Sequence, residues 1–335
     1  MIGELRDGAM TRVYIGIASR DRPKMVSELL DSVARLDIEA NLELAIILVE
    51  NGDGEVLRQA VERFAANSVR IKIHHLVEPR LGIVFARNAA LEFATNSNFD
   101  GLAFVDDDEV VTPTWILELL AEQQRGQYDI VGGPVRAFVD SRPLTFWNRI
   151  VWKGLSTRVQ RVEQACGERK ANGKESQIVL STNNWLVSLP FVRKENLKFD
   201  ERYNLTGGED TRFLRDAWRL GAKTGWAPKA VVREQIVRER LSPWYQIRRA
   251  RDHALVSLND KSDRRPASKW LRGPVSAIFK LLSGLVLLLV APTSNPWDFK
   301  SRVSKSVTAL SSSITSNFTD IVDSNLLQLS YINGS

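Results

Sequence analysis

The chain has 335 residues, of which 44% are hydrophobic and 26% are charged, a composition that excludes general disorder and collagen-like repeats and leaves room for about two domains. A single cysteine, Cys166, excludes a disulfide framework and any zinc or iron–sulfur site built from several cysteines. Residues 1–13 carry both charges and no apolar run, so they do not resemble a secretory signal, and we expect the catalytic part to face the cytoplasm.

The net charge of +6 is unevenly distributed along the chain. Residues 229–272 contain 12 Lys or Arg and 5 Asp or Glu, a net charge of +7, so the remaining residues are close to neutral. We expect this basic region to meet one anionic surface. Its local character argues against a nucleic-acid partner.

Residues 13–140 alternate short apolar runs, which predict strands, with amphipathic patterns, which predict helices. The expected strands are 13–18, 44–50, 71–77 and 102–106, and the expected helices are 23–36, 55–64, 82–94 and 113–124. Strands and helices that alternate at short intervals favour parallel pairing with right-handed crossovers. We therefore expect an α/β fold, with a mixed, mainly parallel sheet that is covered by helices on both faces.

After residue 140 this alternation weakens. Residues 141–177 are polar and rich in Trp and Arg, and we expect them to form a long irregular loop or insertion. Further elements are expected at 178–189, in a helix that begins near Gly208, and at 230–234. These elements complete an expected catalytic domain at residues 1–240.

The region 241–292 is expected to associate with a membrane. It begins with a basic helix at 242–258 and ends with an apolar segment, 273–292, that has one charged residue, Lys280. As a helix this segment would be about 30 Å long, enough to cross the hydrocarbon layer, and the basic residues before it favour a cytoplasmic location for that end. A helix in the membrane interface or buried in the protein is the alternative. Residues 293–335 form a Ser-rich tail that we expect to be weakly structured.

An acidic cluster, Asp106, Asp107, Asp108 and Glu109, directly follows the fourth expected strand. Open α/β sheets bind ligands at the carboxyl ends of their strands. Alternation along a strand would point Asp106 and Asp108 the same way, where Mg²⁺ or Mn²⁺ would neutralise their charges. The alternative is a solvated acidic turn before a helix, whose N-terminus favours carboxylates.

Other polar segments follow the remaining strands and open the later helices. Taken in order, the segments RDRP, VENGD, GIVFARNAAL, FVDDDEVVTPTWI, GGPVRA and TGGEDTRF span residues ~13–235. Their joint occurrence resembles the family 2 glycosyltransferases of GT-A fold, and most of all the succinoglycan-type exopolysaccharide subgroup. The resemblance implies transfer of a sugar, glucose in the first instance, from a UDP-sugar with the help of Mn²⁺ or Mg²⁺.

The resemblance also implies roles for single residues at the strand ends. Ser19 and Arg22 would line the uridine pocket. Glu50 stands where the family usually has an Asp that accepts a hydrogen bond from the uracil ring, so its longer side chain departs from the pattern. Three further residues would bind the nucleotide sugar, namely Arg87, Asp106 and Asp107, and Asp108 would bind the metal.

The same resemblance makes Asp210 the catalytic base, with Glu209 beside it to bind acceptor hydroxyls. One base opposite one leaving group gives direct displacement with inversion. Because Asp210 is expected in the first turn of a helix, we expect the helix dipole to keep its pKa low. Simple charge complementarity with the helix is the alternative role for this acidic pair. Trp185, at a polar strand end shortly before the base, is a candidate for stacking on a sugar ring.

Residues 246–250 partly match a Gln-x-x-Arg-Trp motif of processive family members. An alanine replaces the tryptophan, which favours single additions over polymer extrusion. We expect Arg248, Arg249 or His253 to contact the diphosphate, because guanidinium groups match phosphate oxygens. Attraction to anionic lipid headgroups is the alternative.

Together these observations predict an inverting, metal-dependent glycosyltransferase at the cytoplasmic face of the cell inner membrane. Its expected acceptor is a polyprenyl-diphosphate-linked saccharide, which would account for the basic region and the apolar segment together. Two other functions remain open. A nucleotidyltransferase would share the scaffold and the paired acids, and a membrane-anchored sugar-binding or scaffold protein would share the fold without catalysis.

Overall fold

The structure is a computed structural model that describes residues 10–204 and 207–249. Described residues up to Ile247 belong to one compact unit, and Arg248 and Arg249 belong to a second. His253, the apolar segment 273–292 and the Ser-rich tail 293–335 lie outside the described residues.

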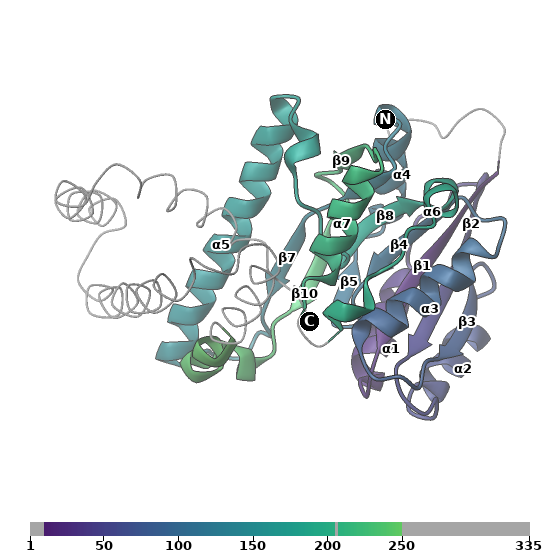
Figure 1. Ribbon diagram of the computed structural model, residues 1–335. Coiled ribbons are helices and arrows are strands. Elements are labelled where there is room, and N and C mark those ends of the chain that lie inside the picture. Colours follow the sequence, from purple (N-terminus) through teal and green to yellow (C-terminus); the bar gives the residue numbers. More distant parts are fainter. Residues whose placement is uncertain (1–9, 205–206, 250–335) are drawn as a thin grey trace. The chain divides into compact units, whose positions relative to one another are not determined.

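Among the described residues, seven strands form the central sheet of the first unit (Figure 1). They are β1 (Thr11–Ser19), β2 (Leu42–Glu50), β3 (Lys72–Val77), β4 (Gly101–Val105), β6 (Ile130–Gly132), β8 (Asn184–Ser188) and β9 (Thr224–Trp226). Their order is β3-β2-β1-β4-β8-β6-β9. Strand β8 runs antiparallel to β4 and β6, whereas the other neighbouring pairs are parallel. The expected mixed, mainly parallel sheet is confirmed.

Alternating side chains divide the hydrophobic core between the two faces of this sheet. On β1, Val13 and Ile15 belong to one core, and Tyr14 belongs to the other. The first core is closed by α1 (Pro23–Val33), α2 (Arg58–Asn67) and α4 (Trp115–Gly126). The second is closed by α3 (Ile83–Thr95), α6 (Leu189–Glu195) and α7 (Glu209–Arg219). Because both faces are covered, the central strands carry continuous apolar runs, such as residues 13–18 of β1 and 44–49 of β2, rather than alternating with polar residues.

A second sheet of three strands continues from the acidic cluster. It consists of β5 (Glu109–Val111), β7 (Val135–Phe138) and β10 (Val232–Gln235) in the order β5-β10-β7. Strand β10 is antiparallel to β5 and parallel to β7. It leads into the short helix η3 (Arg238–Leu241), which returns the chain to the acidic cluster.

The segment expected to be an irregular loop forms a long helix instead, α5 (Phe146–Ala171). The Thr145 hydroxyl caps its N-terminus by accepting a hydrogen bond from the backbone N–H of Asn148, and the helix contains no proline. Of its residues, Cys166 alone is fully buried, so the sequence lacks the apolar stripe by which an amphipathic helix is recognised. The helix ends at Ala171, and the rest of the expected loop contains the short turn η1 (Glu175–Gln177).

The remaining short helix is η2 (Glu201–Tyr203), which precedes α7. Within residues 10–204 and 207–249, no helix combines the length and the apolar character needed to cross a membrane.

Candidate active site

The carboxyl edge of the central sheet collects most of the expected site residues. Strand β1 ends at Ser19, which pairs in register with Glu50 at the end of β2. Strand β4 ends at Val105, immediately before the acidic cluster, and its partner in the antiparallel strand β8 is Asn184. The residues that precede β8 therefore reach the same edge.

Asp107 is fixed by the loop that follows β1. Its two carboxylate oxygens accept hydrogen bonds from the Ser19 hydroxyl at 2.6 Å and from Arg22 Nη1 at 2.8 Å. Burial raises the pKa of Asp107, against the opposing effects of Ser19 and Arg22. These contacts join the RDRP segment to the acidic cluster. The expected uridine contacts of Ser19 and Arg22 stay predictions.

Asp108 lies between two guanidinium groups. Its Oδ2 is 3.6 Å from Arg22 Nη1 and 3.3 Å from Arg240 Nη2, and Arg240 Nη1 is also 3.2 Å from Glu234 Oε1. Burial, with a smaller effect of Asp106, raises the pKa of Asp108. Sequence reasoning missed Arg240. Its local pattern does not distinguish it from Arg238, and the contact depends on the return of η3 to the cluster.

Arg87, on the second turn of α3, joins the acidic cluster to the start of α7. Its Nη2 donates to Asp106 Oδ1 at 3.0 Å and its Nη1 donates to Glu209 Oε1 at 2.5 Å. The side chain is buried, and its charge is balanced by these two carboxylates. The guanidinium lies between the two acids, and the expected contact of Arg87 with the nucleotide stays a prediction.

Asp210 lies in the first turn of α7, after Gly207 and Gly208, whose φ values of 72° and 86° place them in the left-handed region that glycine adopts readily. Its Oδ2 accepts a hydrogen bond from the Ser181 hydroxyl at 3.1 Å, and its Oδ1 accepts one from the backbone N–H of Thr211 at 2.6 Å. Burial and the neighbouring Glu209 raise the pKa of Asp210 to about 6. The expectation of a low pKa was wrong, because loss of hydration outweighs the helix dipole.

Glu209 is buried beside this base. One of its oxygens binds Arg87, whereas Oε2 has no hydrogen-bond partner within the described part of the chain. An unpaired buried carboxylate oxygen is costly, and a hydrogen bond from a ligand would offset that cost. The expected binding of acceptor hydroxyls by Glu209 stays a prediction.

Glu109 holds the acidic turn together from inside. Its carboxylate accepts a hydrogen bond from the backbone N–H of Asp106 at 2.9 Å and another from Asn183 Nδ2 at 3.1 Å. Burial, with smaller effects of Asp106 and Glu234, raises the pKa of Glu109 well above its usual range. Asn183 and Ser181 were not singled out for these roles. The polar run just before the apolar strand β8 was the available signal.

Glu50 has other contacts than the expected hydrogen bond to uracil. Its buried carboxylate accepts hydrogen bonds from the backbone N–H groups of Val56 at 2.9 Å and Leu57 at 3.2 Å, and it lies 2.9 Å from His75 Nε2. These contacts fix the loop that follows β2. The longer side chain reaches back into this loop, and the expected hydrogen bond to uracil stays a prediction.

Trp185 does not face the edge of the sheet. It is fully buried on β8, with ring centroids 5.4 Å from that of Phe213 and 6.5 Å from that of Phe199. A central strand has both faces covered, so its aromatic side chain packs into the core. The proposed stacking of Trp185 on a sugar ring is therefore wrong.

Comparison with known proteins identifies the family. Residues 14–184, just over half of the chain, match glycosyl transferase family 2. The chain belongs to this family. This assignment confirms the expected family and makes the protein a glycosyltransferase.

The family 2 glycosyltransferase described here resembles proteins from bacteria and archaea. It is 28% identical over 247 residues to the succinoglycan biosynthesis protein ExoM of Rhizobium meliloti (strain 1021), an alignment that covers 71% of this chain and 72% of ExoM. Its fold is similar to that of the mannosyltransferase PcManGT from Pyrobaculum calidifontis in complex with GDP-Man and Mn²⁺, with a TM-score of 0.56, 15% identity and coverage of 90% of this chain and 81% of that one. S. aureus TarS 1–349 in complex with UDP gives a TM-score of 0.48 at 17% identity, over 74% of this chain and 66% of that fragment.

The donor atoms of the acidic cluster suit a hard divalent cation. Carboxylate oxygens are preferred by Mg²⁺ and Mn²⁺ over softer metals. In residues 10–204 and 207–249, no three His, Cys, Asp or Glu side chains converge as a ready metal cage. Mg²⁺ in phosphate-transferring sites is commonly held by one or two carboxylates, with phosphate and water completing the shell. A site based on Asp108, with Asp106 near it in the same turn, fits that requirement.

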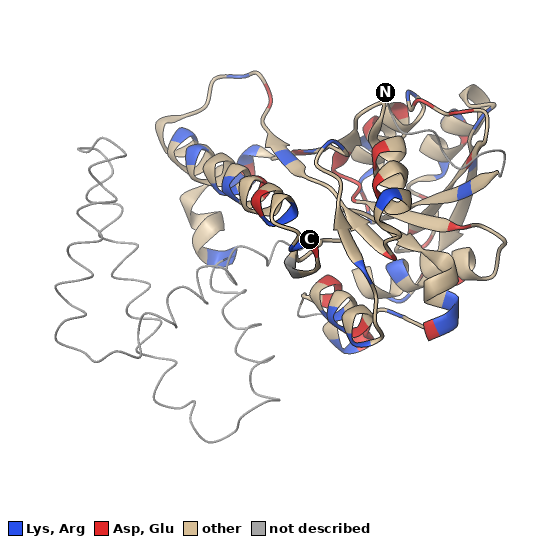
Figure 2. Cartoon of the chain, turned by 90° about the horizontal axis from the view of Figure 1, so that it is seen from above, with Lys and Arg blue, Asp and Glu red and all other residues tan. Residues whose placement is uncertain are grey.

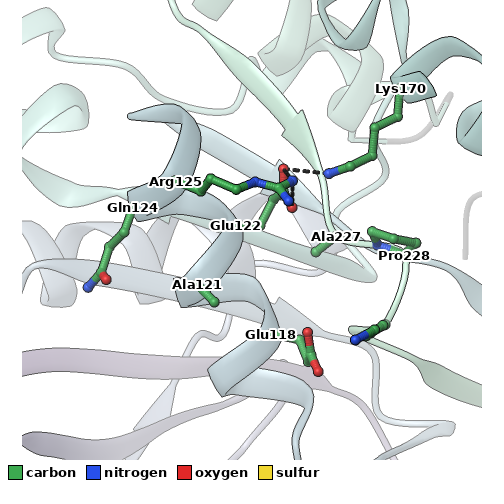
Figure 3. Close-up of a pocket in the computed structure, with 9 residues that line it drawn as sticks. Glu118, Ala121, Glu122, Gln124, Arg125, Lys170, Ala227 and Pro228 are labelled. Atoms are coloured by element: carbon green, nitrogen blue, oxygen red, sulfur yellow. Dashed lines mark hydrogen bonds and ion pairs between the residues drawn. The ribbon is translucent and has the colours of Figure 1, made fainter. Parts of the chain in front are cut away.

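A separate pocket of about 460 Å³ lies between α4, the end of α5 and the loop after β9 (Figure 3). Lys170 of α5 crosses it to donate to Glu122 Oε1 at 2.6 Å and to the backbone oxygen of Trp226 at 2.7 Å. Its lining includes none of the expected site residues. Arg248 and Arg249 are helical, and their expected contact with a diphosphate stays a prediction.

Proposed function

We propose that this family 2 glycosyltransferase moves a hexosyl group, glucose in the first instance, from a UDP-sugar to a hydroxyl of a polyprenyl-diphosphate-linked saccharide. The reaction would invert the anomeric carbon and would take place at the cytoplasmic face of the inner membrane. The similarity to ExoM, a succinoglycan biosynthesis protein, supports a role in bacterial exopolysaccharide synthesis.

The observation that carries this proposal is the link between the acidic cluster and the start of α7. Arg87 binds Asp106 and Glu209 together, and Asp210 follows Glu209 directly. The acidic cluster, which is suited to the cation of a diphosphate, is thereby held close to the candidate base Asp210. Inverting transfer needs these two functions on opposite sides of one sugar ring.

Asp210 is suited to be that base. In the transfer, the acceptor oxygen forms a bond to the anomeric carbon, the bond from that carbon to the phosphate oxygen breaks, and the hydroxyl proton passes to Asp210. A pKa of about 6 leaves the carboxylate mostly ionised at neutral pH, yet more basic than an exposed aspartate. The Ser181 hydroxyl and the Thr211 N–H would hold its orientation.

The leaving diphosphate needs positive charge. Mg²⁺ or Mn²⁺ held by Asp108, with Asp106, would supply Lewis-acid stabilisation of that charge. Arg22 and Arg240 already lie within 3.6 and 3.3 Å of Asp108, so their guanidinium groups are near enough to pair with phosphate oxygens.

The test is a transfer assay on the full chain with UDP-glucose, Mn²⁺ and a polyprenyl-diphosphate-linked saccharide in detergent. We expect equal amounts of UDP and elongated lipid, with an inverted anomeric configuration in the product. Release of pyrophosphate would instead indicate nucleotidyl transfer. Binding of UDP-sugars without turnover of any would support a non-catalytic role.

A further inference from the structure

Large apolar side chains are exposed at the N-terminal end of α5. Phe146 and Trp147 are 58% and 52% exposed, and Ile150, one turn further on, is 38% exposed. The first half of this helix contributes no fully buried residue to the core. Contiguous exposed apolar patches on soluble proteins mark interaction sites.

A second exposed group lies on the helical residues 243–247, at the same end of α5. Trp244 and Ile247 are 71% and 56% exposed. The preceding η3 is tied to the loop before α5, because Arg238 donates to the backbone oxygens of Arg142 at 2.7 Å and Pro143 at 3.0 Å. In Figure 1 the green residues after β10 lie beside the lower end of α5. We call Phe146, Trp147, Ile150, Trp244 and Ile247 the aromatic face.

The segments that carry the aromatic face contain cations and no carboxylates. Residues 146–161 include Arg149, Lys153, Arg158 and Arg161 but no Asp or Glu, and residues 243–249 include Arg248 and Arg249 but no Asp or Glu. Figure 2 shows Lys and Arg along α5 in blue. Aromatic rings with long basic side chains match the interface of a membrane, where the rings enter the headgroup level and the cations meet anionic lipids.

We propose that the aromatic face docks onto an anionic membrane surface. A second copy of this chain is a poorer partner, because a symmetric contact would bring the same cations face to face. The chain also continues from residue 249 toward the apolar segment 273–292, which favours a location beside lipid.

This docking would place the acidic cluster close to a lipid-linked acceptor. Helix η3 connects the two regions, since Arg238 binds the loop before α5 and Arg240 lies 3.3 Å from Asp108. Gln246 Nε2 donates to the backbone oxygen of Arg240 at 2.6 Å, which fixes the residues that carry Trp244 to the same turn. The inference rests on the proposed function for its purpose, though not for its test.

The test uses fluorescent labels on the full chain. Cys166 is the single cysteine and is buried, so a Cys166→Ala background leaves an introduced thiol as the sole labelling site. Ile150→Cys and Ile247→Cys would each carry a nitrobenzoxadiazole group, with Val69→Cys as the matched control, because Val69 is 99% exposed on the α2–β3 loop. Vesicles would contain phosphatidylglycerol and phosphatidylethanolamine, or phosphatidylcholine alone.

We expect the labels at 150 and 247 to shift to shorter emission wavelengths with the anionic vesicles, and the label at 69 to stay unchanged. Arg149→Glu with Lys153→Glu should abolish the shift at 150, whereas Lys24→Glu with Arg58→Glu, elsewhere on the surface, should leave it intact. The assay contains neither donor nor acceptor, so a failed transfer reaction would not affect it.

Three results would overturn the proposal. Protein that sediments with the vesicles while the labels at 150 and 247 stay unchanged is held by another segment. A shift that grows with protein concentration in the absence of lipid indicates that a second copy covers the face. A shift present at every concentration without lipid indicates that residues from the C-terminal part of this chain cover it.

Discussion

At the scale of single residues, the site depends on two carboxylates, the part-exposed Asp106 and the buried Glu209, which share the buried guanidinium of Arg87. Asp106 and Glu209 both bind Arg87, and Asp210 lies next to Glu209. Burial and Glu209 raise the pKa of Asp210, while Arg87 and the hydrogen bonds from Thr211 and Ser181 lower it. The basicity of the candidate base is therefore set by its surroundings in three dimensions more than by its position in a helix.

The first prediction concerns Asp210 itself. If it is the base, kcat/KM should fall as pH decreases through about 6, because the carboxylate becomes protonated there. Asp210→Asn should lower kcat by about 10²–10⁴-fold and remove this acidic limb. Asp216→Asn, which alters part-exposed ion pairs with Arg212 and Arg219 on the same helix, should keep both rate and profile. An unchanged rate in Asp210→Asn would exclude the assignment.

The second prediction concerns Arg87. Replacing it by Met leaves Asp106 and Glu209 without their shared partner, and loss of one member of a buried ion pair costs about 3–5 kcal/mol of unfolding free energy. The acidic limb of activity should also move to higher pH, because Arg87 lowers the pKa of Asp210. Urea unfolding and a pH profile measure the two effects.

Arg63→Met serves as the control, since the Arg63–Asp31 pair is exposed and should contribute about 0–1 kcal/mol. If Arg87→Met were as stable as Arg63→Met, the buried contacts of Arg87 with Asp106 and Glu209 would not contribute to the free energy of unfolding. An acidic limb at the same pH as in the wild type would show that Arg87 does not affect the pKa of Asp210.

At the scale of elements, the sequence predicts those helices and strands whose apolar residues coincide with their buried faces. The strands β1, β2 and β4 and the helices between them follow apolar runs and 3.6-residue periods, because both faces of the sheet are covered. Helix α5 lacks such a pattern, since its first half is exposed. It therefore could not be distinguished from a polar loop.

The candidate site divides in the same way. The placement of Asp108 after a strand and of Glu209 and Asp210 at a helix start could be predicted, and their roles stay predictions. The roles of Arg87 and Arg240 could not be predicted, because each depends on residues more than 100 positions away. Trp185 was misassigned, because the sequence does not show which way a side chain points near a strand end.

The third prediction concerns the start of α3. Gly82 has a φ of 137°, and an added Cβ would lie 1.7 Å from Asn204 Oδ1. Gly82→Ala should therefore cost strain of about 1–3 kcal/mol and also displace the Asn204 amide from the backbone oxygen of Leu81. Gly173→Ala is the matched control, because its φ of 65° carries strain while nothing lies within 4 Å of an added Cβ.

Urea unfolding should rank Gly82→Ala below Gly173→Ala in stability. The double variant Gly82→Ala with Asn204→Ala should recover the part of the loss that comes from the steric clash. Equal losses in the two single variants would mean that the close approach of Asn204 has no energetic consequence.

At the scale of the whole molecule, the acidic cluster couples stability to pH and to cations. The pKa values of Asp107, Asp108, Glu109 and Asp210 are all raised in the folded state, chiefly by burial. A raised carboxylate pKa contributes stability that is fully present below the unfolded value, near 4, and is lost as pH rises through the folded value. At neutral pH these groups therefore oppose folding, and a bound divalent cation should reverse their effect.

The fourth prediction follows from this sign. At pH 7.5 without metal, Asp108→Asn should unfold at a higher temperature than the wild type, and the difference should vanish below about pH 4. In the presence of Mn²⁺, UDP at 100 times the Kd of UDP should stabilise the wild type by about 2.7 kcal/mol. Each kcal/mol corresponds to roughly 2–4 °C in Tm. The Asp108→Asn variant should lose this response, whereas Asp31→Asn, at an exposed position of α1, should keep it. A wild-type Tm that is insensitive to Mn²⁺ and UDP, or an Asp108→Asn variant that responds fully, would place the cation elsewhere than on Asp108.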